Sequence, residues 1–180
     1  MDKLVLVKPN IKHMDQAIEY QQEFNGISES SFSDGVAKYN DWLKKLENTS
    51  IEEGKVPMTA YFAIRESDNR IIGIITIRHY LNDALLKKGG HIGYRVRPTE
   101  RRKGYATQML YLGLKKAKNM KIDKVLLTCD KSNIGSVKTI RSNHGVLEDE
   151  YQDENGEIIQ RYWVDVSYAL AKKGTEINEV

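Results

Sequence analysis

Residues Arg101–Ala106 read Arg-Arg-Lys-Gly-Tyr-Ala, and this short basic stretch decides how the chain is interpreted. It follows a β-rich segment, His91–Arg97, and precedes a run of strong helix formers, Thr107–Met120. A helix that begins directly behind a glycine-containing loop presents unpaired backbone N–H groups, and such groups bind anions. The sequence therefore predicts a phosphate-binding turn between a strand and a helix.

The composition is typical of a globular protein with one domain. The chain has 180 residues, of which 40% are hydrophobic and 29% are charged, and these values argue against disorder or a fibrous class. We expect a single domain over residues 1–170 and a polar tail over residues 171–180. Met1–Pro9 contains only four consecutive apolar residues, and no apolar run approaches the length of a membrane span. We therefore expect a cytoplasmic protein with no membrane partner.

Charge and cysteine content narrow the function classes further. The net charge of +3, from 28 basic and 25 acidic residues, is too mild to predict nucleic-acid binding. The single cysteine, Cys129, cannot form an internal disulfide, and no group of cysteines and histidines has the spacing of a zinc site. We expect neither a metal nor a nucleic acid as a partner.

The spacing of apolar residues predicts strands and helices along the rest of the chain. Besides His91–Arg97, the expected strands are Leu4–Lys8, Tyr61–Ile64, Ile71–Ile77, Lys124–Cys129, Val146–Tyr151 and Ile158–Tyr168. The expected helices are His13–Phe24, a segment capped by Asp34 with apolar residues from Val36 to Leu46, Thr107–Met120, and a helix through Arg141 that Ser132 or Asn133 caps. The second and third strands form a hairpin, and the strands on either side of Thr107–Met120 are joined by a right-handed crossover.

Other phosphate-binding turns fit the basic loop less well. A P-loop requires Gly-Lys followed by Ser or Thr, which is absent here. A dinucleotide-binding turn requires three glycines and an acidic residue at the end of the next strand. An ordinary basic turn is the remaining alternative, but the loop follows a strand, begins a helix and precedes a second strand, so three independent conditions are met together.

These segments together resemble the GCN5-related N-acetyltransferase (GNAT) superfamily. The resemblance covers roughly residues 58–168 and rests on the strand His91–Pro98, the loop Arg101–Ala106, the strand Val125–Cys129 and the helix from Asn133 to Gly145. It implies an α/β (α+β) fold with a central, mixed but mostly antiparallel twisted sheet of about six or seven strands and about four helices. It also implies a splayed parallel pair at the fourth and fifth strands, with acetyl-CoA as co-substrate and direct acetyl transfer to a primary amine.

The resemblance assigns cofactor contacts to residues of this sequence. The pyrophosphate of acetyl-CoA would be held by the backbone N–H groups of Arg101, Arg102, Lys103, Gly104, Tyr105 and Ala106. The pantetheine arm would pair with Arg95, Val96 and Arg97, where one N–H group polarises the thioester carbonyl. Asn133 and Ser136 would contact the same arm, although Asn133 is equally placed to be a helix cap.

The acid and the base of the reaction are less determined. Many family members carry a proton-donating Tyr seven residues after the Asn, whereas this chain has Ile140 there. For the base, His91 aligns with a strand position that is a glutamate in histone-acetylating members, and an imidazole with a pKa of about 6.5 can accept a proton at neutral pH. His79 is a second candidate, and a purely structural histidine is the alternative for both. Cys129 is predicted to be a buried core thiol.

The acceptor is a small-molecule or peptide amine that the sequence does not identify. Four acidic residues, Glu29, Asp34, Glu52 and Glu53, lie where the acceptor pocket is expected and would suit a cationic amine, or simply form a solvated surface. Because Ile140 stands where many family members carry the proton-donating Tyr, a non-catalytic acyl-CoA sensor is an alternative function. A nucleic-acid-binding domain that uses the basic stretches Arg95–Lys103 and Lys115–Lys124 is a third alternative, although no stacking aromatic platform supports it. A homodimer also stays open.

Overall fold

The first half of the chain builds an antiparallel sheet in the computed structural model, which describes residues 2–24, 36–47 and 55–178. Its strands, in spatial order, are β1 (Leu4–Val7), β2 (Met58–Arg65), β3 (Ile71–Arg78) and β4 (Ile92–Val96). β-Branched residues favour extended backbone, and β2 and β3 form the predicted hairpin, with Tyr61 opposite Ile75. β4 is the edge strand of this sheet.

The last three strands form a separate antiparallel sheet. β5 (Lys124–Asp130), β6 (Val146–Gln152) and β7 (Ile158–Asp165) lie in the order β5-β7-β6. The described residues thus contain seven strands, in agreement with the expected number, but the strands are divided between two sheets where we expected one central sheet. β4 and β5 share no ladder and are joined only near their beginnings, which creates the splay that the resemblance implies.

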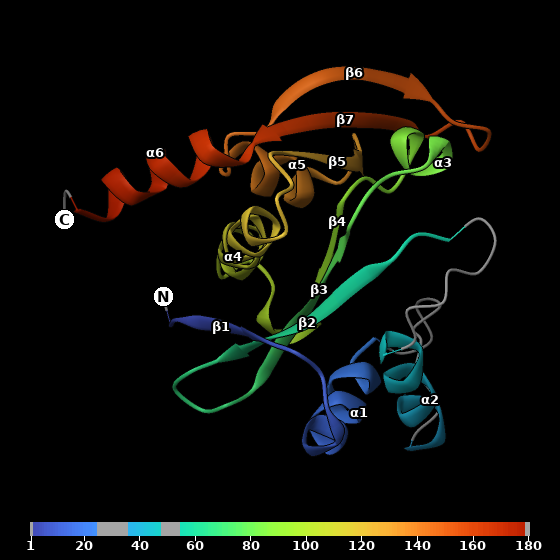
Figure 1. Ribbon diagram of the computed structural model, residues 1–180, viewed down its shortest axis with the longest axis vertical. Coiled ribbons are helices and arrows are strands. Elements are labelled where there is room, and N and C mark those ends of the chain that lie inside the picture. The colour runs from blue at the N-terminus through green and yellow to red at the C-terminus, as the bar shows by residue number, and fades with distance from the viewer. Residues whose placement is uncertain (1, 25–35, 48–54, 179–180) are drawn as a thin grey trace.

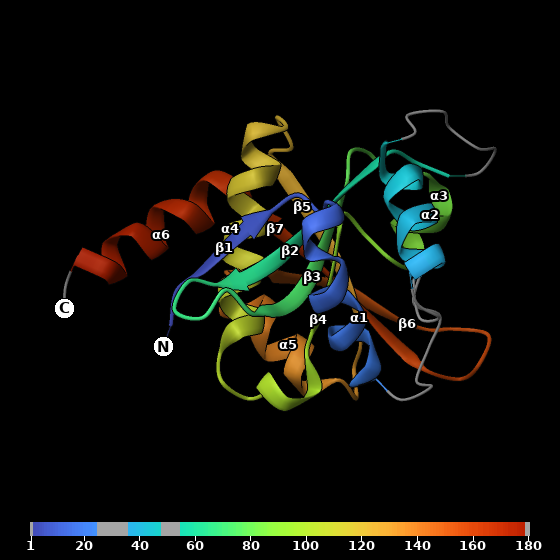
Figure 2. The same ribbon diagram turned by 90° about the horizontal axis from the view of Figure 1, so that it is seen from below.

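Helices cover both faces of the four-stranded sheet (Figures 1 and 2). One face is covered by α1 (Met14–Gln22), which follows a 3-10 turn at Ile11–His13, and by α2 (Val36–Glu47). The other face packs against α4 (Tyr105–Asn119), which also contacts α5 (Ile134–Arg141) and α6 (Val166–Asn178). The short helix α3 (Asp83–Lys87) precedes β4, and a 3-10 turn at Pro98–Glu100 follows it.

Each face of the sheet has its own hydrophobic core. Tyr20 and Phe62 are fully buried between the sheet and the pair α1 and α2. On the other face, Leu110 of α4 belongs to a larger cluster that includes Ile75 from the first sheet and Tyr162 from the second. Because burial of apolar surface is the main stabilising term in folding, α4 is the element that holds the two sheets together.

The C-terminal end differs from the prediction. We expected the last strand to reach Tyr168 and residues 171–180 to be a frayed tail, but β7 ends at Asp165 and α6 continues through Asn178. Asp165 Oδ1 accepts a hydrogen bond of 2.9 Å from Tyr168 N, which is the bond of a helix cap. Val166 and Ala169 are buried against the larger core. With α3, this helix brings the described residues to six α-helices, against about four expected.

Candidate functional site

β4 and β5 are tied together at a strand junction formed by Gly89, Gly90 and His91 on one side and Leu126 and Thr128 on the other. His91 N donates to Leu126 O at 2.7 Å, and Gly89 N donates to Thr128 Oγ1 at 2.8 Å. Gly90 has a φ of 62°, and a β-carbon there would collide with the carbonyl oxygen of Leu126. The close approach of the two sheets therefore requires glycine at this position.

The His91 side chain completes the strand junction. Its Nδ1 accepts a hydrogen bond of 3.0 Å from Leu126 N, and the residue is only 9% exposed. Burial, with a smaller contribution from the Arg78 charge, lowers the pKa of His91 below its usual value. Because Nδ1 uses its lone pair on a backbone amide, the proton of the neutral ring lies on Nε2, and no basic nitrogen is left. This geometry argues that His91 joins the sheets and does not act as the base.

Beyond the strand junction the two strands diverge around a cavity of about 380 Å³, which we call the cleft. Ile92, Gly93 and Tyr94 line it from β4, and residues 127–130 line it from β5. Asn133, Ser136 and Ile140 of α5 lie at one side, and Arg78, Lys88 and Gly89 lie at the other. The cleft therefore passes between the two sheets, from the helical face of β5 to the end of β3.

A tyrosine hydroxyl lies inside the cleft. Tyr94 Oη is 2.9 Å from Ser136 Oγ, so that the side chain reaches from β4 to α5. Burial raises the pKa of Tyr94 to about 12, and the phenol is therefore protonated at neutral pH. Burial also raises the pKa of the Cys129 thiol, which stays uncharged. Ile140 is fully buried and offers no proton. Tyr94 is thus a protonated donor within the cleft.

Asn133 begins α5 and lines the same cleft. Its Oδ1 accepts a hydrogen bond of 3.0 Å from Ser136 N, so the predicted cap is confirmed. Its side-chain amide nitrogen has no hydrogen-bond partner among the residues that the structure describes. An exposed amide donor can bind a carbonyl group of an extended ligand, and the capping role does not prevent this.

The basic loop Arg101–Ala106 has the backbone conformation of an anion site. Arg102 and Gly104 have positive φ values of 64° and 80°, and α4 begins at Tyr105, two residues earlier than expected. Its first turn carries no side-chain cap and no acidic residue. The N–H groups of this turn are therefore available to an anion, in the field of the positive helix end and of the basic side chains.

The family model of the acetyltransferase (GNAT) domain matches residues 3–146. The chain belongs to the acetyltransferase (GNAT) family. A search of the curated proteins found no significant match.

Solved structures of GNAT acetyltransferases share the fold. RimJ of Mycobacterium smegmatis, in complex with CoA-disulfide, has a TM-score of 0.70 at 15% identity, and the match covers 95% of this chain and 89% of that one. The microcin C7 self-immunity acetyltransferase MccE, in complex with acetyl-CoA and AMP, has a TM-score of 0.68 at 15% identity, with 92% and 93% covered. The spermidine/spermine N-acetyltransferase SpeG of Vibrio cholerae has a TM-score of 0.64 at 13% identity, with 94% and 99% covered.

The basic loop is in contact with a buried carboxylate, Glu100, which was not predicted from the sequence. Glu100 is 4% exposed and accepts hydrogen bonds from Lys103 Nζ at 2.9 Å, Arg65 Nη1 at 3.1 Å and Arg70 Nη1 at 3.4 Å. Burial raises its pKa, but the hydrogen bond to Lys103 and the charge of Arg65 outweigh this effect, and the net pKa is lowered. The sequence does contain one indication of this contact, because Glu100 is a single acidic residue directly before three basic residues, Arg101–Lys103. Tyr105 is also buried and accepts from Arg65 Nη1 at 3.2 Å, so only its backbone can serve the loop.

The three strand residues predicted to pair with the pantetheine arm, Arg95, Val96 and Arg97, differ from one another in orientation. Arg97 N donates to Ile72 O at 2.8 Å, and its fully buried side chain pairs with Glu19 at 3.0 Å and Glu23 at 3.3 Å. The structure thus does not bring Arg97 to the cleft. Because the N–H groups of successive strand residues alternate in direction, we expect the N–H group of Val96 to point away from β3. The Arg95 guanidinium lies 4.2 Å from the centre of the Phe24 ring, on the α1 face.

The other predicted residues lie outside the cleft. His79 Nε2 is 2.8 Å from Thr59 Oγ1 at an exposed position, and His79 does not line the cavity. The four acidic residues expected at the acceptor pocket, Glu29, Asp34, Glu52 and Glu53, lie outside the described residues. Within the described ranges no three His, Cys, Asp or Glu side chains could hold a metal ion, and no helix could cross a membrane.

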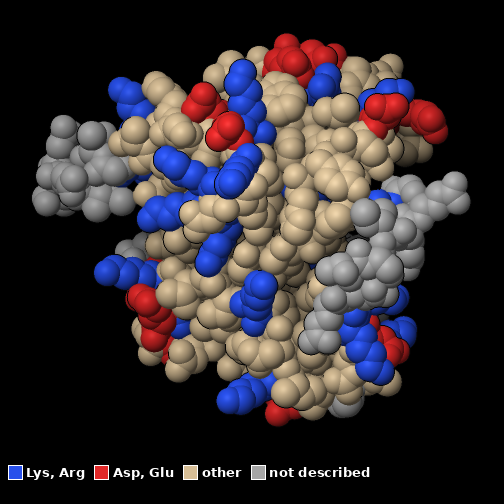
Figure 3. Space-filling view, in the orientation of Figure 1, with Lys and Arg blue, Asp and Glu red and all other residues tan. Residues whose placement is uncertain are grey.

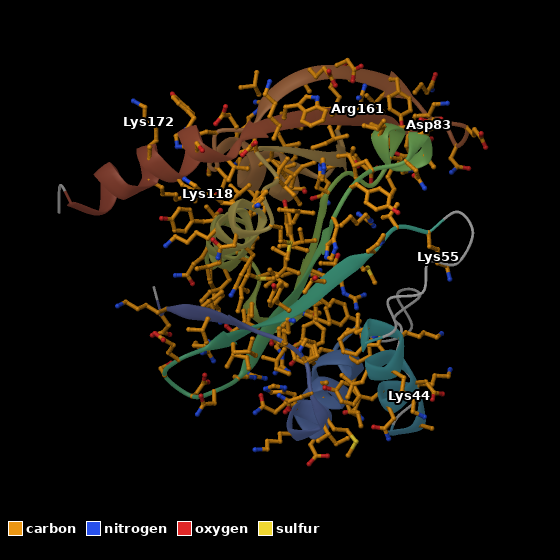
Figure 4. All side chains as sticks on the ribbon, in the orientation of Figure 1. Lys44, Lys55, Asp83, Lys118, Arg161 and Lys172 are labelled. Atoms are coloured by element: carbon orange, nitrogen blue, oxygen red, sulfur yellow. The ribbon has the colours of Figure 1, made fainter. Side chains whose placement is uncertain are left out.

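A separate group of basic side chains lies over α4 and α6 (Figure 3). Lys118 and Lys172 belong to it (Figure 4), and Lys115 Nζ lies 4.8 Å from the centre of the Tyr111 ring. None of these residues lines the cleft. The basic stretch Lys115–Lys124 considered for nucleic-acid binding therefore lies apart from the site described here.

Proposed function

We propose that the protein is an acetyl-CoA-dependent N-acetyltransferase that passes the acetyl group directly to a primary amine. The observation that supports this most strongly is the continuity of the site. The basic loop follows directly on β4, whose residues line the cleft that contains the Tyr94 hydroxyl. A long ligand with phosphates at one end and a reactive group at the other suits this arrangement.

The residues present fit acetyl-CoA. The N–H groups at the start of α4 and the charges of Arg101 and Arg102 suit the pyrophosphate. The outward N–H group of Val96 and the side-chain amide of Asn133 suit the amide groups of the arm. CoA is also named in the complexes of MccE and RimJ, which share this fold.

Acetyl transfer needs a proton donor for the leaving group. The amine nitrogen forms a bond to the thioester carbon, the carbon–sulfur bond breaks, and the sulfur leaves with the electron pair. We assign the protonation of this thiolate to Tyr94, because it is the protonated hydroxyl inside the cleft and Ser136 orients it. The surplus proton of the amine passes to water, since the strand junction occupies His91 Nδ1 and His79 lies outside the cleft.

Two measurements test the proposal. Isothermal titration with acetyl-CoA should show binding, and acetyl-CoA with a panel of polyamines, aminoglycosides, amino acids and peptides should release free thiol together with an N-acetylated product. Absence of binding at millimolar acetyl-CoA would contradict the proposal.

A second function follows from Ile140, the buried apolar residue at the position where many family members carry a Tyr. A non-catalytic acyl-CoA sensor would bind acetyl-CoA as tightly as the enzyme but release no thiol with any amine of the panel. We also propose a cytoplasmic location, which the single cysteine of the chain supports, since cytosolic proteins rarely rely on disulfides.

A further inference from the structure

Arg78, the last residue of β3, brings a guanidinium group to the cleft. Its Nη1 donates to Gly90 O at 2.9 Å and to Gly89 O at 3.2 Å, so the residues that build the strand junction also fix the side chain. Its backbone N donates to His91 O at 2.8 Å. Arg78 is therefore anchored at the wall of the cleft and remains a cation, since an arginine keeps its proton in proteins.

Arg78 differs from three other arginines that are largely buried. Arg65, Arg97 and Arg161 each have one or more carboxylate partners within 3.3 Å. Arg78 has no carboxylate partner in the part of the chain that the structure describes, and its hydrogen bonds there use Nη1 alone. Its Nε and Nη2 groups are thus free to donate. A guanidinium held out of water has most to gain from a carboxylate that accepts two parallel hydrogen bonds.

The other charged groups of the cleft indicate which charges a ligand bound at Arg78 would carry. Lys88 is neutralised by Asp153 at 2.7 Å. Asp130, at the end of β5, has no cation within ion-pair distance among the described residues, although it lines the same cavity. Among the described residues the cleft therefore contains a guanidinium and a carboxylate that each lack an ion-pair partner, and together they complement a ligand with an anionic group and an ammonium group.

We propose that the acceptor is an amino carboxylate, whose carboxylate binds to Arg78 and whose amino group is oriented by Asp130. The inference rests on the proposed function and specifies its substrate class. Because the cleft extends from Arg78 past Tyr94 to Ser136, a carboxylate at Arg78 directs the amine toward the hydroxyl that protonates the leaving group. Acceptors that carry only positive charges, such as polyamines, meet a like charge at Arg78 and are disfavoured.

The first experiment compares matched acceptors on the unmodified protein. Amino acids are offered beside their carboxamides and their decarboxylated amines, and kcat and KM are measured from thiol release. We expect kcat/KM to be roughly tenfold to a hundredfold higher for the free acid, mainly through KM, because a charge-assisted bidentate contact is lost in the other two. Equal values for acid and amide, or turnover of polyamines alone, would overturn the proposal.

Variants assign the discrimination to Arg78. Arg78→Gln should abolish most of the preference for the acid, Arg78→Lys should retain a part of it as a point charge, and both should bind acetyl-CoA with the affinity of the unmodified protein. Lys87→Gln removes the same charge from α3 outside the cleft and should keep the preference. Thermal unfolding of each variant shows whether loss of the Gly89 and Gly90 contacts has disturbed the fold.

The outcomes separate this inference from the proposed function. Acetyl-CoA binding and turnover without a preference for carboxylates would leave the acetyltransferase standing and refute the amino carboxylate. An unchanged preference in Arg78→Gln would also refute it. If acetyl-CoA does not bind to the unmodified protein, both fail.

Discussion

The two ends of the site, the basic loop at residues 101–106 and the strand junction at residues 89–91, are built in different ways. The loop is separated from β4 only by a 3-10 turn, and its proposed anion binding rests on the conformation of Arg102 and Gly104 and on the uncapped helix behind it. The strand junction joins residues that are 35 or more positions apart, such as His91 and Leu126. The conformation of the loop therefore depends on residues that are neighbours in the sequence. The strand junction depends on contacts between residues that are distant in the sequence.

The largest effect is expected at the strand junction. Gly90→Ala places a β-carbon against the Leu126 carbonyl oxygen at a positive φ and should lower the free energy of unfolding by on the order of 3 kcal/mol. Urea-induced unfolding measures the change. Gly135→Ala is the matched control, because its nearest neighbour would lie 3.6 Å away in α5, and it should stabilise by up to about 1 kcal/mol. A Gly90→Ala protein as stable as the control would show that the sheets are not held together here.

Between the two ends lies Tyr94, whose removal should affect catalysis and little else. Tyr94→Phe eliminates the proton donor and should lower kcat by about a hundredfold, while the Kd for acetyl-CoA from titration changes by less than about threefold. Tyr151→Phe on β6 removes an exposed hydroxyl that donates to Lys87 O of α3 and should not change kcat. A kcat that stays within a factor of about two in Tyr94→Phe would exclude it as the acid.

The strand junction should also make the stability of the protein depend on pH. Because the folded pKa of His91 is lowered by burial, the unfolded chain binds a proton first as the pH falls below about 6.5. Stability is therefore complete above this pH and decreases as the pH falls toward the folded pKa. Urea unfolding at pH 7.5 and pH 5 should show a smaller loss for His91→Asn than for the unmodified protein. An identical loss in both would show that His91 does not carry the effect.

The smallest effect is expected for a basic side chain of the loop. Lys103→Ala should weaken acetyl-CoA binding by only about threefold in titration calorimetry, because backbone N–H groups carry the phosphate contact and the side chain is half exposed. Lys44→Ala on α2 removes the same charge far from the loop in sequence and should leave the Kd unchanged. A loss above about thirtyfold in Lys103→Ala would indicate that side chains carry the binding.

The same contrast explains which features could be predicted from the sequence. Period-two and helical patterns located the seven strands, and a cap was predicted at Ser132 or Asn133, of which the structure uses Asn133, because these features depend on neighbours in the chain. The division into two sheets was missed, because it depends on a contact between residues distant in sequence: the His91 side chain accepts the hydrogen bond of Leu126 N, and no ladder forms between β4 and β5. The inward position of Arg97 was also missed, although Glu19 and Glu23 lie one helical turn apart on α1 and could have indicated an internal partner for a cation.

Within the candidate site, the residues proposed to contact the cofactor and those proposed to act in catalysis differ in how far they depend on local sequence. The loop and Asn133 depend on backbone geometry that local sequence determines. Tyr94 and Arg78 are held in position by residues that are distant in sequence, Ser136 in one case and the strand junction in the other. Nothing in the residues next to Tyr94 indicated its contact with α5.

The buried Glu100 has a consequence for the rate and the entropy of binding. Its three cationic partners fix the residues around the loop when the chain folds, so the conformational entropy of ordering this segment is lost during folding and not during encounter with a ligand. A preorganised anion site retains more of its contact energy as affinity. Association at such a site does not wait for a loop to order, and we expect it to follow a single kinetic step whose rate falls as salt screens the basic side chains.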